Sequence, residues 1–288
     1  MTTQSSYELP FKVDNAWCPG CGNFGVLNSV KKTLSDIDIP AQNVVFSSGI
    51  GQAAKLPQYV HTNYFNGLHG RALPVATAIK ASNPELLVIA EGGDGDMYGE
   101  GGNHFLHTIR RNVDIVHLVH NNMVYGLTKG QASPTSQRGM VTPLQINGVS
   151  LEPANPLAVA LSYGAGFVAR VFSGDTKEMQ RIISEAVKYK GYALIDIFPP
   201  CVSFNKINTY KWFKENTYYV SDDYDNTSFE QALGKVFEQE SLPMGILYKN
   251  PKNEKSFSEH LVAYKNNSKA LHERTVDTKK LQTVVDSL

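Results

Sequence analysis

The sequence of 288 residues lacks several features that would place it in a special class of protein. It has no apolar run approaching the roughly 18 residues that span a bilayer, so we expect no transmembrane helix and no membrane partner. The N-terminus has no basic region followed by an apolar core, so we expect no signal peptide and a cytoplasmic protein. Acidic and basic residues cancel, with 27 of each, which argues against the basic surface of a nucleic-acid-binding protein.

Cysteine is scarce, since only Cys18, Cys21 and Cys201 occur. An odd number of cysteines excludes a complete disulfide framework, and in a reducing compartment thiols are more often ligands than bridges. The spacing Cys18-x-x-Cys21 is typical of a ligand pair. The simpler interpretation is a redox pair or two unligated thiols.

Short apolar segments alternate with helical patterns over the first two thirds of the chain. The expected strands are almost continuously apolar, as strands buried on both faces are; they are Val44–Phe46, Leu86–Glu91, Val113–His120, Gly166–Phe172 and Tyr192–Phe198. The expected helices are Gly25–Leu34, Leu73–Lys80, Gly102–Arg111 and Thr176–Lys190, the last capped by Asp175. This alternation predicts an α/β fold with a doubly wound, mostly parallel sheet, and ligands beyond the carboxyl ends of its strands.

The alternation stops after Pro200. An amphipathic helix is expected over Phe229–Gln239, and residues 249–269 are polar. We therefore predict one domain over residues 1–205 and a C-terminal extension over residues 206–288. The extension is expected to pack on the sheet or on a partner subunit.

Polar residues follow two neighbouring expected strands. Gly93-Asp94-Gly95-Asp96 follows one strand, and Asn121-Asn122 follows the next. Oxygen ligands suit Mg²⁺, which shares its coordination with phosphates, and the glycines let backbone N–H groups reach a diphosphate. We predict a magnesium-bound diphosphate cofactor, with Asp94, Asn122 and the carbonyl of Val124 as metal ligands. The alternative is a pair of turns that contain common turn-forming residues.

The spacing between Asp94 and Asn122 resembles the thiamine-diphosphate fingerprint. Further motifs occur in order along the chain, at Trp17–Gly22, Ser48–Gly51, Gly67–Ala72, Gly102–Phe105 and Tyr125–Gln131. Together they resemble the beta subunits of two-subunit 2-oxoacid:ferredoxin oxidoreductases, over about residues 14–220.

The resemblance implies a sheet of the thiamine-diphosphate-binding type and an enzyme that oxidatively decarboxylates 2-oxoacids, 2-oxoglutarate or pyruvate, with coenzyme A. Thiamine diphosphate would be the electron sink, with its aminopyrimidine on an alpha, or fused gamma-alpha, subunit that supplies the activating glutamate. Electrons would pass through an iron–sulfur cluster to ferredoxin. The alternatives are a non-oxidative thiamine-dependent decarboxylase or synthase subunit, and a paralogue impaired in electron transfer.

Further site residues are expected in the glycine-rich loops and after the paired asparagines. His69, Lys55 and Leu127 are the catalytic candidates. His69 would donate to the diphosphate or the substrate, or would brace its loop. Lys55 would bind a distal carboxylate and favour 2-oxoglutarate, or would be a solvated surface lysine. Leu127 would wall the substrate pocket or lie in the core. The expected cofactor contacts are Gly49, Ile50, Gly51, His69, Gly70, Gly93, Asp94, Gly95, Asp96, Asn122, Val124, Tyr125, Gly126, Leu127 and Thr128.

The three cysteines resemble the family's [4Fe–4S] binding pattern, with one departure. The fourth cysteine of that pattern follows the Ser-Gly-Ile-Gly run, where this chain has Gln52. Such clusters are normally held by four thiolates, so a four-thiolate site cannot be built from this chain. We expect a retained cluster on Cys18, Cys21 and Cys201. The alternatives are a non-cysteine fourth ligand, a three-iron cluster, no cluster, and a zinc site that includes a histidine.

Overall fold

The structure is a computed structural model, and it describes residues 7–238, 240–252, 255–267 and 269–288. A sheet of eight strands runs through the described part of the chain, in the order β2-β1-β3-β4-β6-β5-β8-β7. Neighbouring strands are parallel except for β5 and β8. The strands are β1 Val44–Ser48, β2 Asn63–Asn66, β3 Leu87–Gly93, β4 Ile115–His120, β5 Phe167–Phe172, β6 Tyr192–Phe198, β7 Thr217–Tyr219 and β8 Leu242–Lys249.

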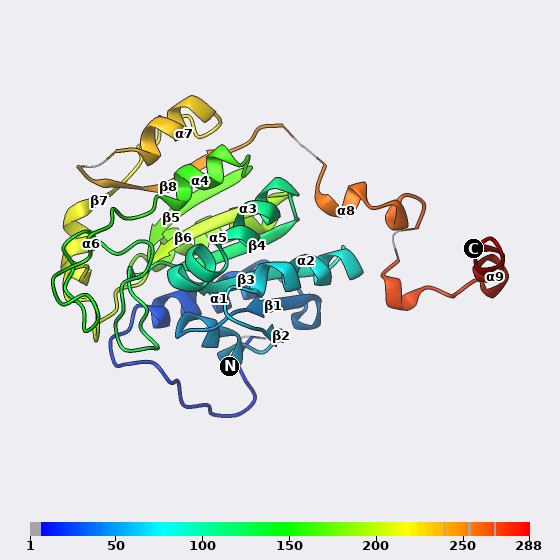
Figure 1. Cartoon of the computed structure of the whole chain (residues 1–288), viewed down its shortest axis with the longest axis horizontal. Helices are drawn as coiled ribbons and strands as arrows, with labels where there is room; N and C mark the ends of the chain where they lie inside the picture. The colour runs from blue at the N-terminus through cyan, green and yellow to red at the C-terminus, as the bar shows by residue number, and fades with distance from the viewer. Residues whose placement is uncertain (1–6, 239, 253–254, 268) are drawn as a thin grey trace.

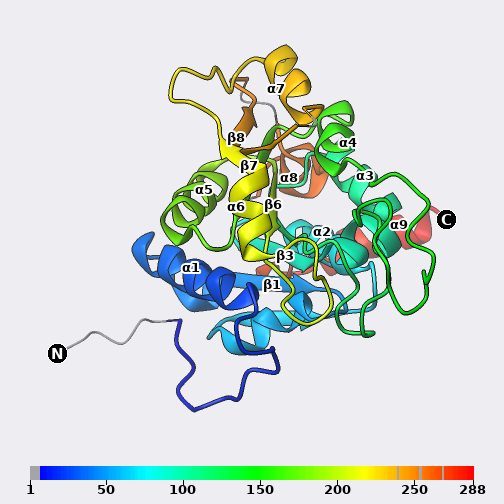
Figure 2. The same ribbon diagram turned by 90° about the vertical axis from the view of Figure 1, so that its left-hand side faces the viewer.

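Helices cover both faces of the sheet (Figures 1 and 2). α1 (Asn23–Asp36) and α5 (Thr176–Lys188) lie on one face. α2 (Ala72–Ser82), α3 (Gly102–Arg110) and α4 (Pro156–Ser162) lie on the other. Each helical layer forms its own apolar core with one face of the sheet. The central strands β4, β5 and β6 are therefore buried along their whole length. The doubly wound, mostly parallel α/β fold is therefore confirmed.

The expected strands and helices of the first two thirds form with small shifts of their ends. The Asp175 side chain caps α5 by accepting a hydrogen bond from the backbone N–H of Glu178, as expected. The helix expected over Phe229–Gln239 is α7, Phe229–Val236, and its expected end Gln239 lies outside the described residues. α7 contacts α4 and β8, so the extension packs on the sheet.

Three strands were not predicted. β2 has four exposed residues and β7 has only three residues, so neither carries the apolar pattern of a buried strand. β8 contains Pro243 and Gly245, which usually interrupt strands. It pairs antiparallel to β5 through a register shift, close to Gly245 at φ 111°. Its presence shows that the sheet continues past residue 205, while the proposed domain boundary stays a prediction.

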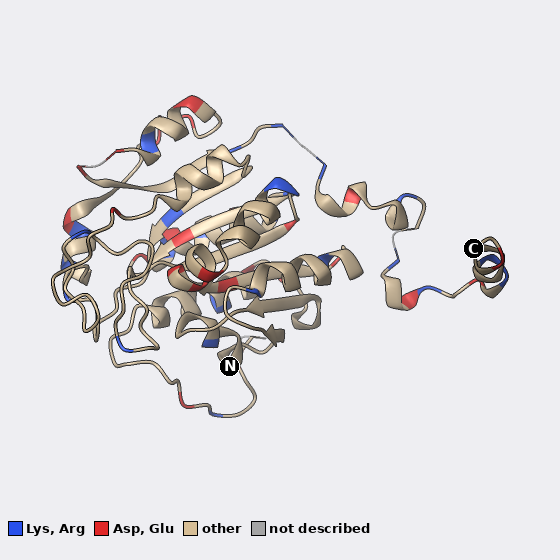
Figure 3. Ribbon diagram, in the orientation of Figure 1, with Lys and Arg blue, Asp and Glu red and all other residues tan. Residues whose placement is uncertain are grey.

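After β8 the chain leaves the sheet as an arm that holds α8 (Phe257–His260) and α9 (Thr278–Asp286) (Figure 1). The Tyr264 hydroxyl fastens the arm by donating to the carbonyls of Ala81 and Ser82 at the end of α2. α9 is exposed along its whole length. Acidic and basic residues are scattered over the ribbon, and the arm carries both (Figure 3). No described helix is long and apolar enough to cross a membrane.

Candidate functional site

The candidate site lies where β1, β3 and β4 end. These three strands are parallel neighbours, and the register sets Ser48 beside Glu91 and Gly93 beside His120. The loops that follow therefore leave the same edge of the sheet. Sheets of this type bind ligands at that edge.

Asp94 lies directly after β3 and is 1% exposed. Its Oδ2 accepts hydrogen bonds from the hydroxyls of Ser133 (2.5 Å) and Thr135 (2.8 Å). Burial raises the pKa of the Asp94 carboxyl to about 6, and the two hydroxyls lower it in part. A buried carboxylate with a raised pKa is stabilised by a cation, so Asp94 fits the role of a magnesium ligand.

Ser133 and Thr135 were not predicted as site residues. They belong to the run Ser133-Pro134-Thr135-Ser136, which lies on a loop after β4. Three hydroxyl residues within four positions were the only signal. Their partner Asp94 is 39 residues away from Ser133 in the chain, so only the fold reveals the contact.

A buried polar chain continues from Thr135 into the sheet. The Thr135 hydroxyl also contacts the side-chain oxygen of Asn121 (2.7 Å), and the Asn121 amide donates to Asp196 on β6 (3.1 Å). Arg170 on β5 donates to the same carboxylate at 2.9 Å, and the Tyr98 hydroxyl donates to it at 2.9 Å. Asn121, the first asparagine of the pair, therefore has a structural role, because it connects Thr135 to Asp196.

The other two expected metal ligands lie in a turn of unusual conformation. Met123, between them, has φ 59°, which is uncommon for a residue with a side chain. The Asn122 side-chain oxygen accepts from the backbone N–H of Val124 at 3.1 Å, and Asn205 donates to the Asn122 carbonyl at 3.0 Å. This turn supplies neutral oxygen atoms next to the loop of Asp94, a donor set that suits Mg²⁺.

Asp96 lies in η3 (Gly95–Glu100), the helix after β3, and contacts two loops. Its Oδ1 accepts from the backbone N–H groups of Ile50 (3.1 Å) and Gly70 (2.7 Å) and contacts Nδ1 of His69 (2.5 Å). Its Oδ2 is buried and has no hydrogen-bond partner among the described residues. Burial raises the pKa of this carboxyl, and the backbone donors lower it in part. Asp96 therefore fixes the loops after β1 and β2 against η3.

Glycine is required where these loops cross. A Cβ on Gly49 would lie 2.0 Å from Oδ2 of Asp96, and a Cβ on Gly95 would lie 2.1 Å from the Tyr125 ring. Gly51, in contrast, has φ 140° and faces open space, as expected for a backbone that a ligand approaches. Gly93 is also open, because a Cβ added there would have no neighbouring atom closer than 3.8 Å.

The three catalytic candidates differ in their surroundings. His69 braces its loop through Asp96, and 39% of its side chain stays exposed to a ligand. Leu127 is 41% exposed, so its alternative role as a core residue is wrong. Lys55 is half-buried in η2 (Ala53–Tyr59) and forms no ion pair within the described residues.

The segment from Tyr125 to Gln131 forms a closed turn. The backbone N–H of Tyr125 donates to the Gln131 carbonyl at 2.9 Å, and the Thr128 hydroxyl contacts the Gln131 side chain. The Tyr125 hydroxyl donates to the Gly95 carbonyl at 3.2 Å. The turn is thereby attached to the loop that carries Asp94.

The three cysteines line one cavity. Its wall also includes Gln52 and two residues of the candidate magnesium loop, Asn122 and Gly126. Burial raises the pKa of the Cys21 thiol to about 11, and the charges of Cys201 and Cys18 raise it as well. Thiolates in such a place need a bound cation. Within the described residues, no three His, Cys, Asp or Glu side chains are arranged to hold a single metal ion.

A buried acid–base pair, His120 and Glu91, lies between the paired asparagines that follow β4 and Asn23, close to Cys21. Nε2 of His120, at the end of β4, lies 3.3 Å from Oε1 of Glu91 on β3, and Nδ1 of His120 contacts Asn23 at 2.9 Å. Burial raises the pKa of Glu91 well above its usual value and lowers that of His120 to about 3. Both shifts have the same cause, because burial disfavours the charged form of each group.

Two family models cover most of the chain. Residues 46–197 match the thiamine pyrophosphate enzyme, C-terminal TPP binding domain. Residues 201–277 match the C-terminal part of the pyruvate ferredoxin oxidoreductase beta subunit. The boundary between the two matches lies close to the end of β6.

Similar proteins and a similar solved structure agree with these matches. A 2-oxoacid:ferredoxin oxidoreductase subunit beta of a Sulfolobus species is 41% identical over 95% of each chain. The 2-oxoglutarate synthase subunit KorB of Methanocaldococcus jannaschii is 31% identical over 82% of this chain and 90% of its own. A 2-oxoglutarate:ferredoxin oxidoreductase from Magnetococcus marinus, with 2-oxoglutarate, coenzyme A and succinyl-CoA bound, superposes with a TM-score of 0.90 at 33% identity, covering 99% of this chain and 97% of that one.

Proposed function

Because this chain belongs to the family of 2-oxoacid:ferredoxin oxidoreductase beta subunits, we propose that it serves the oxidative decarboxylation of 2-oxoacids with coenzyme A, with electrons passed to ferredoxin. The match to a thiamine pyrophosphate-binding domain over residues 46–197 carries this proposal. The bound molecules of the Magnetococcus structure favour 2-oxoglutarate as a substrate and coenzyme A as the acyl acceptor.

Asp94, Asn122 and the Val124 carbonyl hold Mg²⁺ in this proposal, and the metal binds the diphosphate of thiamine diphosphate. When bound, thiamine diphosphate supplies the electron sink for decarboxylation. The chain's own task is orientation. Ser133 and Thr135 fix Asp94, and Asp96 fixes the loops of Ile50 and Gly70 on which the diphosphate would lie.

His69 and Leu127 face the remainder of the cofactor and the substrate in this proposal, and Lys55 binds the distal carboxylate of 2-oxoglutarate. The exposure of His69 and Leu127 supports their role as contacts of the cofactor and the substrate, because a ligand-binding surface must be open in the absence of the ligand. For Lys55, the support is its position in η2, directly after the loop that Asp96 anchors.

An alpha subunit, or a fused gamma-alpha subunit, completes the site in this proposal and supplies the activating glutamate. The support is the apolar surface of the site loops, where large side chains are strongly exposed: Leu68 (74%), Val141 (68%), Leu144 (68%), Ile146 (72%) and Leu151 (75%). Apolar patches of this kind mark interaction surfaces. The chain alone is then expected to be inactive.

Cys18, Cys21 and Cys201 would hold an iron–sulfur cluster in this proposal, and the cluster would supply the acceptor for the electrons. The support is the shared cavity, whose wall joins the cysteines to Asn122 and Gly126 of the magnesium loop. A cluster in this cavity would lie next to the metal end of the cofactor. Ferredoxin would accept the electrons at the surface, where Cys18 is exposed.

The test is dye reduction by the purified two-subunit complex. We expect methyl viologen reduction that requires both a 2-oxoacid and coenzyme A, and its loss in Asp94→Ala, with the surface variant Asp223→Ala as the control. Release of CO₂ without dye reduction would favour the non-oxidative alternative. Binding of thiamine diphosphate with neither activity would favour the impaired paralogue.

A further inference from the structure

The side chain of Gln52 has an unpaired buried oxygen. Gln52 is the N-cap residue of η2, directly after Gly51, and its Oε1 is buried without a hydrogen-bond partner among the described residues. The indole N–H of Trp17 donates to the Gln52 backbone carbonyl at 2.7 Å, which fixes the residue in place. An unpaired buried polar atom is unfavourable, so this oxygen is a candidate ligand atom.

Gln52 belongs to the wall of the cavity that the three cysteines line. The other polar side chains of its wall already have partners. Asn23 pairs with His120 (2.9 Å), the Asn122 oxygen accepts from Val124 (3.1 Å), and the Ser203 hydroxyl donates to the sulfur of Cys18 (3.0 Å). Among the described residues of the cavity wall, Gln52 alone therefore presents a buried side-chain oxygen with no partner.

Resting on the cluster of the proposed function, we propose that the amide oxygen of Gln52 is the fourth ligand of an iron–sulfur cluster whose other ligands are Cys18, Cys21 and Cys201. Among the described residues, no three His, Cys, Asp or Glu side chains are arranged to hold a single metal ion, whereas each thiolate of a cluster binds a different iron. The alternative zinc site would take a histidine as its fourth ligand, and none lies in the described wall of this cavity.

An amide oxygen differs from a thiolate in two respects. It is a hard, neutral ligand on an iron that prefers soft thiolates, so the bond at this corner is weaker and more easily exchanged. It also leaves the cluster less negative by one charge, which raises its reduction potential. The iron bound by Gln52 is therefore the one that the cluster would lose most easily.

The loss is a one-electron oxidation. Ferricyanide takes one electron from the oxidised four-iron cluster, the bond between Gln52 and iron breaks, and that iron leaves as Fe²⁺. The three remaining irons are all ferric and stay bound to the three thiolates. The product is paramagnetic and visible by EPR, whereas the starting cluster is silent.

The experiment uses the complex with its partner subunit, purified without oxygen, as wild type, Gln52→Ala, Gln52→Glu and Gln52→Cys. Gln58→Ala, an exposed glutamine of the same η2, is the matched control. Iron, acid-labile sulfide and the three-iron EPR signal are measured before and after ferricyanide. Binding of thiamine diphosphate and dye reduction are measured in parallel.

We expect the wild type to lose about a quarter of its cluster iron to ferricyanide and to regain it with Fe²⁺ and a reductant. Gln52→Ala should lose this iron at least several-fold faster and be purified in part as the three-iron form. Gln52→Glu, which keeps an oxygen ligand, should be slower than Gln52→Ala. Gln52→Cys should resist, and Gln58→Ala should match the wild type.

Equal rates of iron loss in wild type and Gln52→Ala would overturn the assignment of Gln52 while leaving the proposed function intact. A wild type without iron, beside a Gln52→Cys variant with a full cluster, would also overturn it. Absence of iron from every variant would refute the proposed electron route, and the assignment with it. Thiamine diphosphate binding shows in each case whether the fold was preserved.

Discussion

At the scale of single residues, the position of the Asp94 carboxylate depends on two hydroxyls that donate to it. Of the two, Thr135 makes the larger number of contacts. Its hydroxyl also contacts Asn121 and so connects Asp94 to the buried series of polar contacts that ends at Arg170. Replacing it by valine keeps the shape and removes both contacts. Asp94, the proposed metal ligand, would then lose the support that orients it.

We expect Thr135→Val to weaken binding of magnesium and thiamine diphosphate roughly 10- to 100-fold, as for other residues that orient a metal ligand. Isothermal titration of the two-subunit complex with the cofactor, at fixed Mg²⁺, measures this. Thr227→Val is the control, because its hydroxyl contacts only Asp225 in a surface turn. Unchanged affinity in Thr135→Val would contradict the role given to the hydroxyl.

Lys55 is the residue on which substrate choice depends in the proposal. Replacing it by isoleucine removes a charge-assisted contact worth about 1.5–3 kcal/mol, so the ratio of kcat/KM for 2-oxoglutarate to that for pyruvate should fall roughly 10- to 100-fold. Steady-state kinetics with both substrates give the ratio. Lys32→Ile, on the exposed side of α1, should leave it unchanged.

Much of the site was predictable at this scale, because Asp94 and Asn122 follow strands that the sequence shows clearly. Ser133 and Thr135 were not, since the loop that holds them has no periodic pattern and their partner is distant in the chain. Asp96 was expected to contact the cofactor, and in the structure its contacts are to Ile50, His69 and Gly70. Its direct role at the cofactor stays a prediction.

At the scale of elements, the end of β1 and the end of β3 meet without room for a side chain. A Cβ at Gly49 would overlap the Asp96 carboxylate, and that carboxylate holds the loops of Ile50 and Gly70. We expect Gly49→Ala to lower the free energy of unfolding by about 1–3 kcal/mol and to weaken cofactor binding. Gly102→Ala, at the start of α3 with no atom within 4 Å of the added methyl group, should be neutral or slightly stabilising.

Urea unfolding of both variants, followed by circular dichroism, measures the difference. A stable Gly49→Ala variant with normal cofactor affinity would show that the loops can part without harm to the site, contrary to the role given to Asp96.

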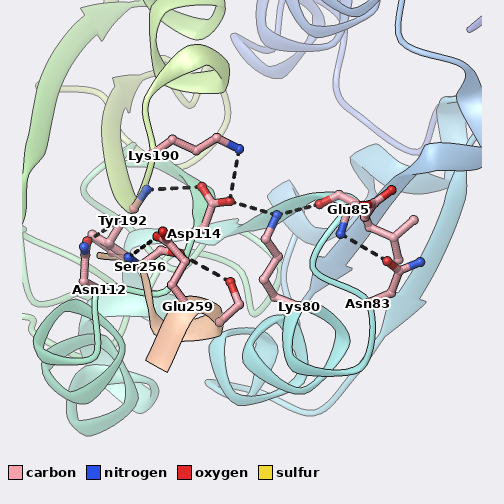
Figure 4. A network of polar contacts seen from close by, with 12 residues as sticks. Lys80, Asn83, Glu85, Asn112, Asp114, Lys190, Tyr192, Ser256 and Glu259 are labelled. Carbon is pink, nitrogen blue, oxygen red and sulfur yellow. Dashed lines mark hydrogen bonds and ion pairs between the residues drawn. The ribbon is translucent and has the colours of Figure 1, made fainter. Parts of the chain in front are cut away.

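A buried ion pair connects α2 to the start of β4 at the opposite edge of the sheet (Figure 4). Nζ of Lys80 lies 3.0 Å from Oδ2 of Asp114, with the two side chains 6% and 13% exposed. Burial lowers the pKa of Lys80, and Asp114 offsets this effect in part. The same network reaches Asn112, Ser256 and Glu259, so it also holds the beginning of the arm (Figure 4).

Asp114→Asn leaves the Lys80 charge buried and unpaired, so we expect a loss of about 3 kcal/mol in the free energy of unfolding at neutral pH. Lys190→Ala, which removes the exposed partner of Asp114, should cost at most about 1 kcal/mol. The folded-state pKa of Lys80 lies below its unfolded value of 10.5, so the folded state binds fewer protons there and stability rises with pH in that range.

The Asp114→Asn variant lowers the Lys80 pKa further, and its deficit should therefore shrink as the pH is raised. Urea unfolding at neutral and at alkaline pH tests both statements. A deficit that stays constant with pH would show that the lost stability does not come from the lysine charge.

The elements themselves were predictable where apolar runs are long. β4, β5 and β6 are buried on both faces, and the sequence shows this directly. β8 was not predictable, because Pro243 and Gly245 interrupt its pattern and its pairing depends on contact with β5. The sequence around β8 gives no indication that it pairs with β5, which is distant in the chain.

At the scale of the whole molecule, the arm ends in a helix with one apolar side. Leu281, Val284 and Val285 of α9 are 55%, 59% and 53% exposed, at a spacing that places them along one stripe. The helix lies away from the sheet (Figure 1). We expect the partner subunit to cover this stripe, which is one of the two ways in which the C-terminal extension was expected to pack.

We expect Leu281→Ser combined with Val285→Ser to weaken the two-subunit complex at least tenfold, equivalent to about 1.4 kcal/mol, because apolar area is no longer buried. The thermal unfolding midpoint of the isolated chain should not change. Lys280→Ser is the control on the same helix. Sedimentation of the complex over a dilution series gives the affinity, and equal affinities would show that α9 does not reach the partner.

The exposed edge strand β2 affects how much of this subunit persists in the cell when it lacks its partner. All four residues of β2 are exposed, with Tyr64 at 48% and Phe65 at 53%, and its outer side has no neighbouring strand in the described structure. Open apolar edges pair with other chains and start aggregates. Copies made in excess of the partner would then be lost to aggregation or proteolysis, so balanced synthesis of the two subunits sets how much of this one survives.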